Sequence, residues 1–221
     1  MKKLIAIIFI FTVTAVFAAT VKRSSTRDFP LHSAESAPES SQAIAEGYQK
    51  KLGAVPNVVG VMAEAPALLN SYVAIQQNLG KMGTLTPQQN NVVQMAISRE
   101  NECFYWTAAH SGIAVAVFGS EEEEIAELRT GDPLSDPKSE ALRLFSIAVY
   151  KGQGRITDKE FQAFIDAGFN RAQALDVVTN IAAKVMTNFT NQIALTPVDE
   201  SFSSQLEGVS YAEEREVKVS E

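Results

Sequence analysis

The sequence predicts an all-α fold, and three observations support this prediction. Apolar residues recur at three- and four-residue spacing, as in Leu68, Leu69, Tyr72, Ile75 and Leu79, which is the pattern of one helix face. Proline and glycine divide the chain into segments of helical length. No stretch longer than a few residues shows the period-two alternation of a half-buried strand.

Each expected helix has a recognisable start or stop signal. Thr86-Pro87 combines an N-cap with a proline at the first helical position, and Ser120/Glu123 and Thr157/Glu160 read as capping boxes. In chain order, we expect nine helices. They run from near Ser41 to before Gly53, from Pro56 to Pro66, from Pro66 to near Met82, from Pro87 to near Ser98, from near Cys103 to Phe118, from after Ser120 to before Gly131, from Pro137 to near Tyr150, from after Thr157 to Gly168 and from Asn170 to near Ala194.

Length and composition indicate one globular domain. The chain has 221 residues, of which 46% are hydrophobic, and a formal net charge of −7. This is enough for a single core, and the absence of a basic cluster outside the first residues argues against nucleic-acid binding. There is no Gly-rich phosphate loop, HExxH or GxSxG motif, and the adjacent glutamates 121–124 point in different directions. No cofactor or metal is therefore expected.

The N-terminus has the pattern of a secretory signal peptide over residues 1–18. Two lysines precede an apolar run from Leu4 to Phe17, and small residues at Val16 and Ala18 fit a cleavage site before Ala19. The expectation is export to a bacterial periplasm, with an uncleaved anchor as the alternative. Residues 19–40 are then expected to form a flexible arm, residues 41–199 the helical domain and residues 200–221 a disordered tail. His32, in the arm, is expected to be exposed and without a role.

One stretch, residues 100–110, carries the residues most suited to chemistry. It holds Cys103, the only cysteine, and His110, one of two histidines. On a helix these residues share a face about 10 Å apart along the axis, with Trp106 between them, so a bridging group would be needed to connect thiol and imidazole. Near a helix N-terminus, which Asn101 or Ser98 would cap, the dipole favours a thiolate. The alternative is a small buried hydrophobe beside a core histidine.

The same stretch resembles the signature of the carboxymuconolactone decarboxylase superfamily, above all its alkyl hydroperoxidase D-like branch. The matching residues are Leu85-Thr86-Pro87, then Asn101-Glu102-Cys103-Phe104-Tyr105, and His110 in register. The resemblance covers roughly residues 40–200 and implies a single-domain alkyl hydroperoxidase D-like helical bundle. It also implies assembly as a homo-oligomer, a trimer or hexamer.

Two central positions depart from the family pattern. Trp106 stands where the family has its second cysteine, and Asn91 stands where the family has a glutamate. In the family, this glutamate and the histidine relay protons to the second cysteine. A chain with one cysteine cannot form an internal disulfide, so the family's two-thiol cycle is excluded.

Three functions remain open. The first is a thiol-dependent peroxidase that reduces a small hydroperoxide at Cys103, with His110 as proton partner, Trp106 as a pocket wall and an external thiol as reductant. The second is a non-redox, decarboxylase-like enzyme in which His110 and Tyr105 are acid–base groups on a small acidic or lactone substrate. The third is an inactive binding or scaffold protein, in which Trp106 fills the core.

Overall fold

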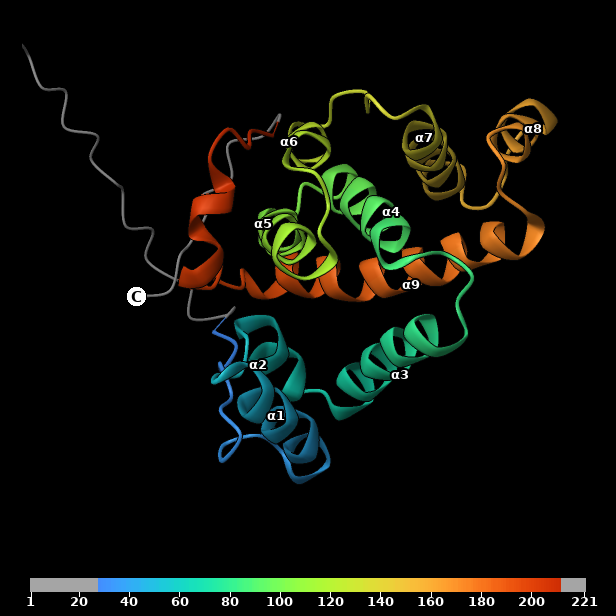
Figure 1. The fold of residues 1–221 in the computed structure, drawn as a ribbon. Helices are drawn as coiled ribbons and strands as arrows, with labels where there is room; N and C mark the ends of the chain where they lie inside the picture. Colours follow the sequence, from blue (N-terminus) through green and yellow to red (C-terminus); the bar gives the residue numbers. More distant parts are fainter. Residues whose placement is uncertain (1–27, 212–221) are drawn as a thin grey trace, which may run out of the picture.

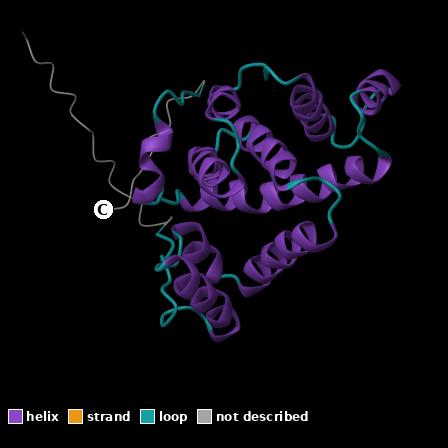
Figure 2. Cartoon of the chain, viewed as in Figure 1, coloured by secondary structure: helices purple, strands orange, loops and turns teal. Residues whose placement is uncertain are grey.

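A computed structural model describes residues 28–211, and these residues form helices and no β-strand (Figure 2). The all-α prediction is confirmed. The expected signal peptide lies outside the described residues, as do residues 212–221 of the expected tail. No helix within residues 28–211 has the length and apolarity needed to cross a membrane.

Nine α-helices, one π-helical turn and one 3-10 helix follow one another in the described part of the chain. They are α1 (Glu39–Leu52), α2 (Asn57–Ala63), α3 (Pro66–Met82), α4 (Pro87–Glu100), α5 (Phe104–Ile113), η2 (Ala114–Phe118), α6 (Glu122–Thr130), α7 (Pro137–Lys151), α8 (Asp158–Asp166), α9 (Arg171–Ala194) and η3 (Glu200–Leu206).

The start signals explain most of these boundaries. The side chains of Thr86 and Thr157 accept hydrogen bonds from the backbone three residues on, and the expected capping box at Thr157/Glu160 is present. The expected box at Ser120/Glu123 is wrong, because α6 begins one residue later with Glu121 as an N-cap that makes no side-chain cap. The helix expected from Cys103 to Phe118 ends as a π-helical turn from residue 114 onward.

The long helix α9 lies at the centre of the molecule. Figure 1 shows it running between α1–α3 on one side and α4–α7 on the other. It packs against α2, α3, α4 and α7. Every side chain that α9 turns inward therefore lies between two layers of helices.

Two clusters of buried side chains make up the core. One surrounds Trp106, Met62 and Leu69, between α1–α3, α5 and α9. The other, between α4 and α6–α9, contains Phe164, whose ring stacks on Phe145 at a centroid distance of 4.1 Å and on Phe169 at 4.6 Å. The first cluster borders the candidate site, and the second holds α7 and α8 to α4 and α9.

Residues 28–38 pack against α2, although residues 19–40 are expected to be a flexible arm. A side chain at Gly60 would meet the backbone oxygen of His32 at 2.9 Å, so glycine permits this close approach. His32 Nε2 lies 2.7 Å from Glu64 Oε2. The prediction that His32 is exposed and idle is wrong, because its side chain is 13% exposed and ties this segment to the end of α2.

The segment after α9 turns back over α5, so the predicted disordered tail does not begin at residue 200. Asp199 accepts hydrogen bonds from the Tyr105 hydroxyl and from the Asn57 backbone. In η3, Phe202 lies so close to α5 that a Cβ at Gly112 would be 3.2 Å from its ring. These contacts fix η3 as one wall of the site described next.

Candidate functional site

A tight turn between α4 and α5 positions Cys103. Glu102 takes a left-handed conformation with φ 49°, and Cys103 is itself the N-cap of α5. The Asn101 side chain bonds back to Ile97 O instead of capping α5. The prediction that Asn101 or Ser98 caps this helix is therefore wrong. Cys103 does not lie in the first turn, as predicted, but occupies the N-cap position just before it.

The Cys103 thiol is buried but surrounded by donors. Burial is the largest influence and raises the pKa of the thiol, while the Trp106 backbone N–H, the nearby Lys184 and the Asn191 amide act in the opposite direction. The Asn191 Nδ2 lies 3.7 Å from the sulfur. Because burial prevails, the raised pKa favours the thiol over the thiolate that a helix N-terminus alone would favour.

His110 is held at both of its ring nitrogens. Its Nδ1 lies 3.0 Å from Asn91 Oδ1, and its Nε2 lies 3.0 Å from Lys184 Nζ. The Asn91 amide nitrogen meets Met95 Sδ at 3.3 Å, which leaves the amide oxygen to accept from Nδ1–H. Burial, followed by the charge of Lys184, keeps the pKa of His110 well below its usual 6.5. The imidazole is therefore neutral, with its proton on Nδ1.

Lys184, on α9, is a residue that the sequence analysis missed. It is fully buried, and its Nζ lies 3.6 Å from the centroid of the Trp106 ring. Burial holds the pKa of its amine well below 10.5, and the one group that acts in the other direction is Cys103. No carboxylate contributes to this shift. Lys184 thus contacts His110 and influences the Cys103 thiol electrostatically.

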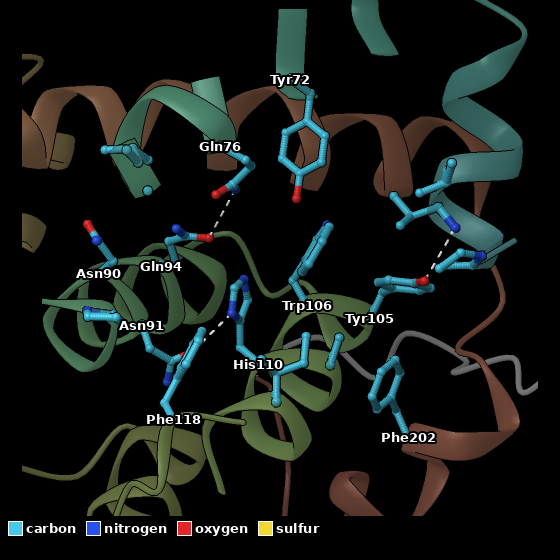
Figure 3. Close-up of a pocket in the computed structure, with 18 of the residues that line it drawn as sticks. Tyr72, Gln76, Asn90, Asn91, Gln94, Tyr105, Trp106, His110, Phe118 and Phe202 are labelled. Atoms are coloured by element: carbon cyan, nitrogen blue, oxygen red, sulfur yellow. Dashed lines mark hydrogen bonds between the residues drawn. The ribbon is translucent and has the colours of Figure 1, made fainter. Parts of the chain in front are cut away.

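A cavity of about 430 Å³ opens beside this set of residues. Trp106, Tyr105, His110 and Asn91 all line it, together with Phe202 from η3, as Figure 3 shows. The structure thus brings Trp106, Tyr105 and Asn91 together with His110 around one cavity. A cavity of this size fits a small organic molecule.

Cys103 does not line the cavity. Its exposed fraction is 3%, and it belongs to the buried cluster around Met62. The structure therefore separates the two residues expected to share the chemistry, with His110 at the cavity wall and the thiol outside it.

The polar groups of the cavity wall are mostly paired with protein atoms. The Tyr105 hydroxyl donates to Asp199 and accepts from the Val58 backbone. Gln94 donates to Asn180 at 2.8 Å. By contrast, Trp106 Nε1 is buried and has no hydrogen-bond partner within the described part of the chain.

The signal that could have revealed Lys184 lies on α9. Its buried face carries a polar stripe, Asn180, Lys184, Thr187, Asn188 and Asn191, at helical spacing. Because core-facing helix positions are normally recognised by apolar residues, this polar stripe is not recognised as buried from the sequence. Lys184 falls between Ala183 and Val185, where an isolated lysine is easily taken for a solvent-exposed side chain.

The arrangement of these helices defines the class of fold, that of the alkylhydroperoxidase AhpD core. No protein-family model matches the sequence, and no curated protein matches it either. Solved structures do match, each over 82–83% of this chain and 96–97% of the other chain.

Three such structures are informative. The AhpD core of an uncharacterized peroxidase-related protein from Ralstonia eutropha JMP134 has a TM-score of 0.71 at 22% identity. An uncharacterized peroxidase-related protein from Silicibacter sp. TM1040 has a TM-score of 0.67 at 22% identity. A cysteine-to-alanine variant of the debrominase Bmp8 with 2,3,4-tribromopyrrole has a TM-score of 0.67 at 14% identity. At these identities the likeness confirms the predicted alkyl hydroperoxidase D-like fold.

Proposed function

We propose that the protein binds a small, largely apolar molecule in the cavity beside Trp106, as a version of the alkyl hydroperoxidase D-like fold whose thiol no longer faces the binding site. The observation that carries this proposal is the composition of the wall. It presents aromatic rings and amide side chains, and no thiol. Apolar cavities with few polar groups are the usual form of small-molecule sites.

The state of the predicted catalytic groups supports binding over acid–base catalysis. Both nitrogens of His110 are bonded to side chains, and the Tyr105 hydroxyl is bonded to Asp199 and to the backbone. Neither group has a free position toward a substrate. The decarboxylase-like function is therefore less well supported. The debrominase Bmp8, solved with 2,3,4-tribromopyrrole, suggests that this fold accommodates a small aromatic molecule.

Because the chain contains one tryptophan, a labelled sample gives one indole N–H resonance. A panel of small aromatic compounds is titrated into the chain from residue 19 onward, which contains every described helix. Binding in the cavity shifts this resonance in a saturable manner. A well-folded sample whose indole resonance moves with no member of the panel contradicts the proposal.

Two glycines provide a matched pair of variants for this titration. Gly80 lines the cavity and Gly47 does not, and an added Cβ at either position meets nothing within 4 Å. Gly80→Phe places a ring at the cavity wall and is expected to weaken binding, while Gly47→Phe leaves it unchanged. Equal effects of the two substitutions would argue against this cavity as the binding site.

A second candidate function is the thiol-dependent peroxidase. It is favoured by the donors around Cys103, namely the Trp106 backbone N–H, the Asn191 amide and the nearby Lys184. In this reaction the thiolate attacks one peroxide oxygen, the O–O bond breaks, and the departing alkoxide takes a proton. Cys103 becomes a sulfenic acid, which two equivalents of an external thiol reduce to the thiol, giving water and a disulfide.

A sulfenic-acid trap distinguishes the two candidates. One equivalent of an organic hydroperoxide is added, and the mass of the intact chain is measured with and without the trap. Rapid trapping that disappears in Cys103→Ser, and that is slowed in Lys184→Met, supports the peroxidase. We expect Cys103 to be unreactive in the folded protein because it is buried, and this result would contradict the peroxidase function.

We also propose export and self-association. The signal-peptide pattern of residues 1–18 supports a periplasmic location, which fractionation of a bacterial host tests.

The proposal of self-association rests on an apolar face of α9. This face has exposed fractions of 47–70% and consists of Leu175, Val178, Phe189 and Ile193. A second copy of this chain is the proposed partner of this face. Light scattering should show an oligomer that Ile193→Glu dissociates, and a monomeric wild type would refute the assembly.

A further inference from the structure

Four side chains in the cavity wall end in an amide, which donates at its nitrogen and accepts at its oxygen. They are Gln76 on α3 and Asn90, Asn91 and Gln94 on α4. Figure 3 shows Gln76 reaching from α3 toward Gln94. What a ligand meets in this wall depends on how each amide is oriented and on which of its atoms already has a partner.

The orientation of Gln76 follows from a chain of hydrogen bonds that begins at a backbone oxygen. Asn180 Nδ2 donates to Asp176 O at 2.9 Å, and a carbonyl oxygen only accepts, so the amide oxygen of Asn180 is the end that meets Gln94. Gln94 therefore turns its nitrogen toward Asn180, at 2.8 Å, and its oxygen toward Gln76. Gln76 faces this oxygen with its own nitrogen, at 3.5 Å. The opposite orientation of Gln76 would bring two oxygens together.

The hydroxyl of Tyr72 supports the same orientation. Burial is the largest influence and raises the pKa of Tyr72, the nearby Tyr48 adds to this effect, and the Gln76 side chain acts in the opposite direction. A hydrogen-bond donor lowers the pKa of a phenol, because it stabilises the charged form. The nitrogen end of Gln76 is therefore the end that faces Tyr72 and Gln94.

The oxygen of Gln76 is consequently the acceptor that this chain leaves for a ligand. It accepts no hydrogen bond from another group within residues 28–211, whereas the oxygens of Asn90, Asn91 and Gln94 each face another side chain within hydrogen-bond distance. Gln76 is half-buried, and its oxygen is not among the enclosed polar atoms, unlike Trp106 Nε1. A ligand in the cavity can therefore reach it. Ligand acceptors can use the second N–H groups of Gln76 and Gln94, but among the amide oxygens a ligand donor has Gln76 Oε1.

Charged side chains are absent from the described residues that line the cavity, since none of them is aspartate, glutamate, lysine or arginine. An anion would lose its hydration there without gaining a charged partner, and its oxygens would be repelled by the Gln76 oxygen. A neutral ligand avoids both costs.

We propose that the cavity selects neutral, largely apolar molecules that carry an N–H or O–H donor, such as indoles or phenols, and that Gln76 Oε1 accepts this hydrogen bond. The inference rests on the proposed function and adds its ligand class. It disfavours the acidic and lactone substrates that the sequence analysis left open, since the former are anions and a simple lactone carries no donor.

Three aromatic probes separate the donor from shape and charge. Indole carries one N–H donor, benzofuran is the same bicycle with an ether oxygen in place of the N–H, and benzoate is an anion. Each is titrated into the chain from residue 19 onward and followed by ligand-detected NMR. We expect indole to bind roughly tenfold more tightly than benzofuran, because one hydrogen bond is gained, and more tightly than benzoate.

The side-chain carbonyl carbon of Gln76 reports this bond directly. In protein labelled with carbon-13, its resonance is assigned by its loss in Gln76→Lys. Indole and benzofuran have similar ring-current effects, so a larger shift at saturation with indole isolates the hydrogen bond. This measurement uses the wild-type protein and decides the matter even if the variant fails to fold.

The variant Gln76→Lys keeps an N–H donor toward Gln94 and removes the acceptor. It should reduce the preference for indole over benzofuran by roughly tenfold. Gln77→Lys is the matched control, because Gln77 is exposed on the same helix and does not line the cavity, and it should retain the wild-type preference. The ratio of the two affinities is read in each protein, so a general change in binding cancels. Circular dichroism checks that both variants are folded.

The outcomes separate the two levels of the proposal. Equal binding of indole and benzofuran, tighter binding of benzoate, a preference that persists in folded Gln76→Lys, or a carbonyl shift at Gln94 instead of Gln76 would overturn the inference while small-molecule binding stands. The same holds if none of the three probes binds but another member of the aromatic panel shifts the Trp106 resonance. If the whole panel also fails to shift it, both the inference and the proposed function are overturned.

Discussion

Replacing Lys184 by methionine should change how stability depends on pH. Burial holds the pKa of the native amine well below 10.5. Between this lowered native pKa and 10.5 the unfolded chain therefore binds more protons than the native protein, so native stability rises with pH through this window and is lost as pH falls toward the native pKa. The slope for one proton is about 1.4 kcal/mol per pH unit. In Lys184→Met this contribution disappears.

The assay is urea unfolding of both proteins between about pH 8.5 and about pH 10, just below the ordinary lysine pKa, where a full proton difference changes the stability gap by up to about 2 kcal/mol. The lost bond from Nζ to His110 Nε2 adds a pH-independent cost of about 1–3 kcal/mol, which shifts the difference without altering its slope. Lys81→Met is the control, since Lys81 is exposed and the same substitution there disturbs no buried group.

If the difference in unfolding free energy between wild type and Lys184→Met does not change with pH, this reasoning is refuted. Lys184 would then carry its proton in both the native and the unfolded state, and Cys103 would lose no proton on folding. A neutral amine beside a thiol and an ammonium beside a thiolate bind the same number of protons, so both give the expected slope. The ultraviolet absorbance of a thiolate, measured against Cys103→Ser, distinguishes them. A thiolate signal would favour the peroxidase.

Three further changes have expected outcomes. Tyr105→Phe removes the bond to Asp199, so urea unfolding should show a loss of about 1.5–3 kcal/mol, with faster amide exchange in η3 as the local readout. Phe164→Ala empties the centre of a stacked trio of rings and should cost about 3–5 kcal/mol in the same assay. His110→Gln removes an imidazole whose native pKa burial holds well below 6.5. As pH falls below 6.5, wild type should lose up to about 1.4 kcal/mol per pH unit relative to this variant, and parallel curves would contradict the neutral assignment.

Much of the helix order could be predicted because its signals are local. Proline at the first turn, as in Pro66, Pro87 and Pro137, and the capping box at Thr157 act within a few residues. Such signals also fail locally. The Ser120/Glu123 pattern has the right residues, but the chain enters α6 one residue later.

The site depends on contacts that the sequence does not display. The pairing of His110 with Asn91 joins two helices, and its contact with Lys184 comes from a third, 74 residues away. Residues 200–206 look like the start of a polar tail, yet they form η3, whose Phe202 lines the cavity. The separation of Cys103 from the cavity follows from how α5 packs, and spacing along one helix cannot predict it.

The tryptophan that lines the cavity is one base change away from a second thiol. The codon for tryptophan differs from both cysteine codons at a single base, so one mutation at position 106 would give a chain with two cysteines in a Cys-x-x-Cys arrangement. Trp106→Cys would exchange an indole for a sulfur and enlarge the cavity that the indole lines. Lys184, whose Nζ lies 3.6 Å from the Trp106 ring, would remain beside this position. None of the described residues that line the cavity is aspartate or glutamate, so placing a carboxylate in the same wall would require at least a second substitution.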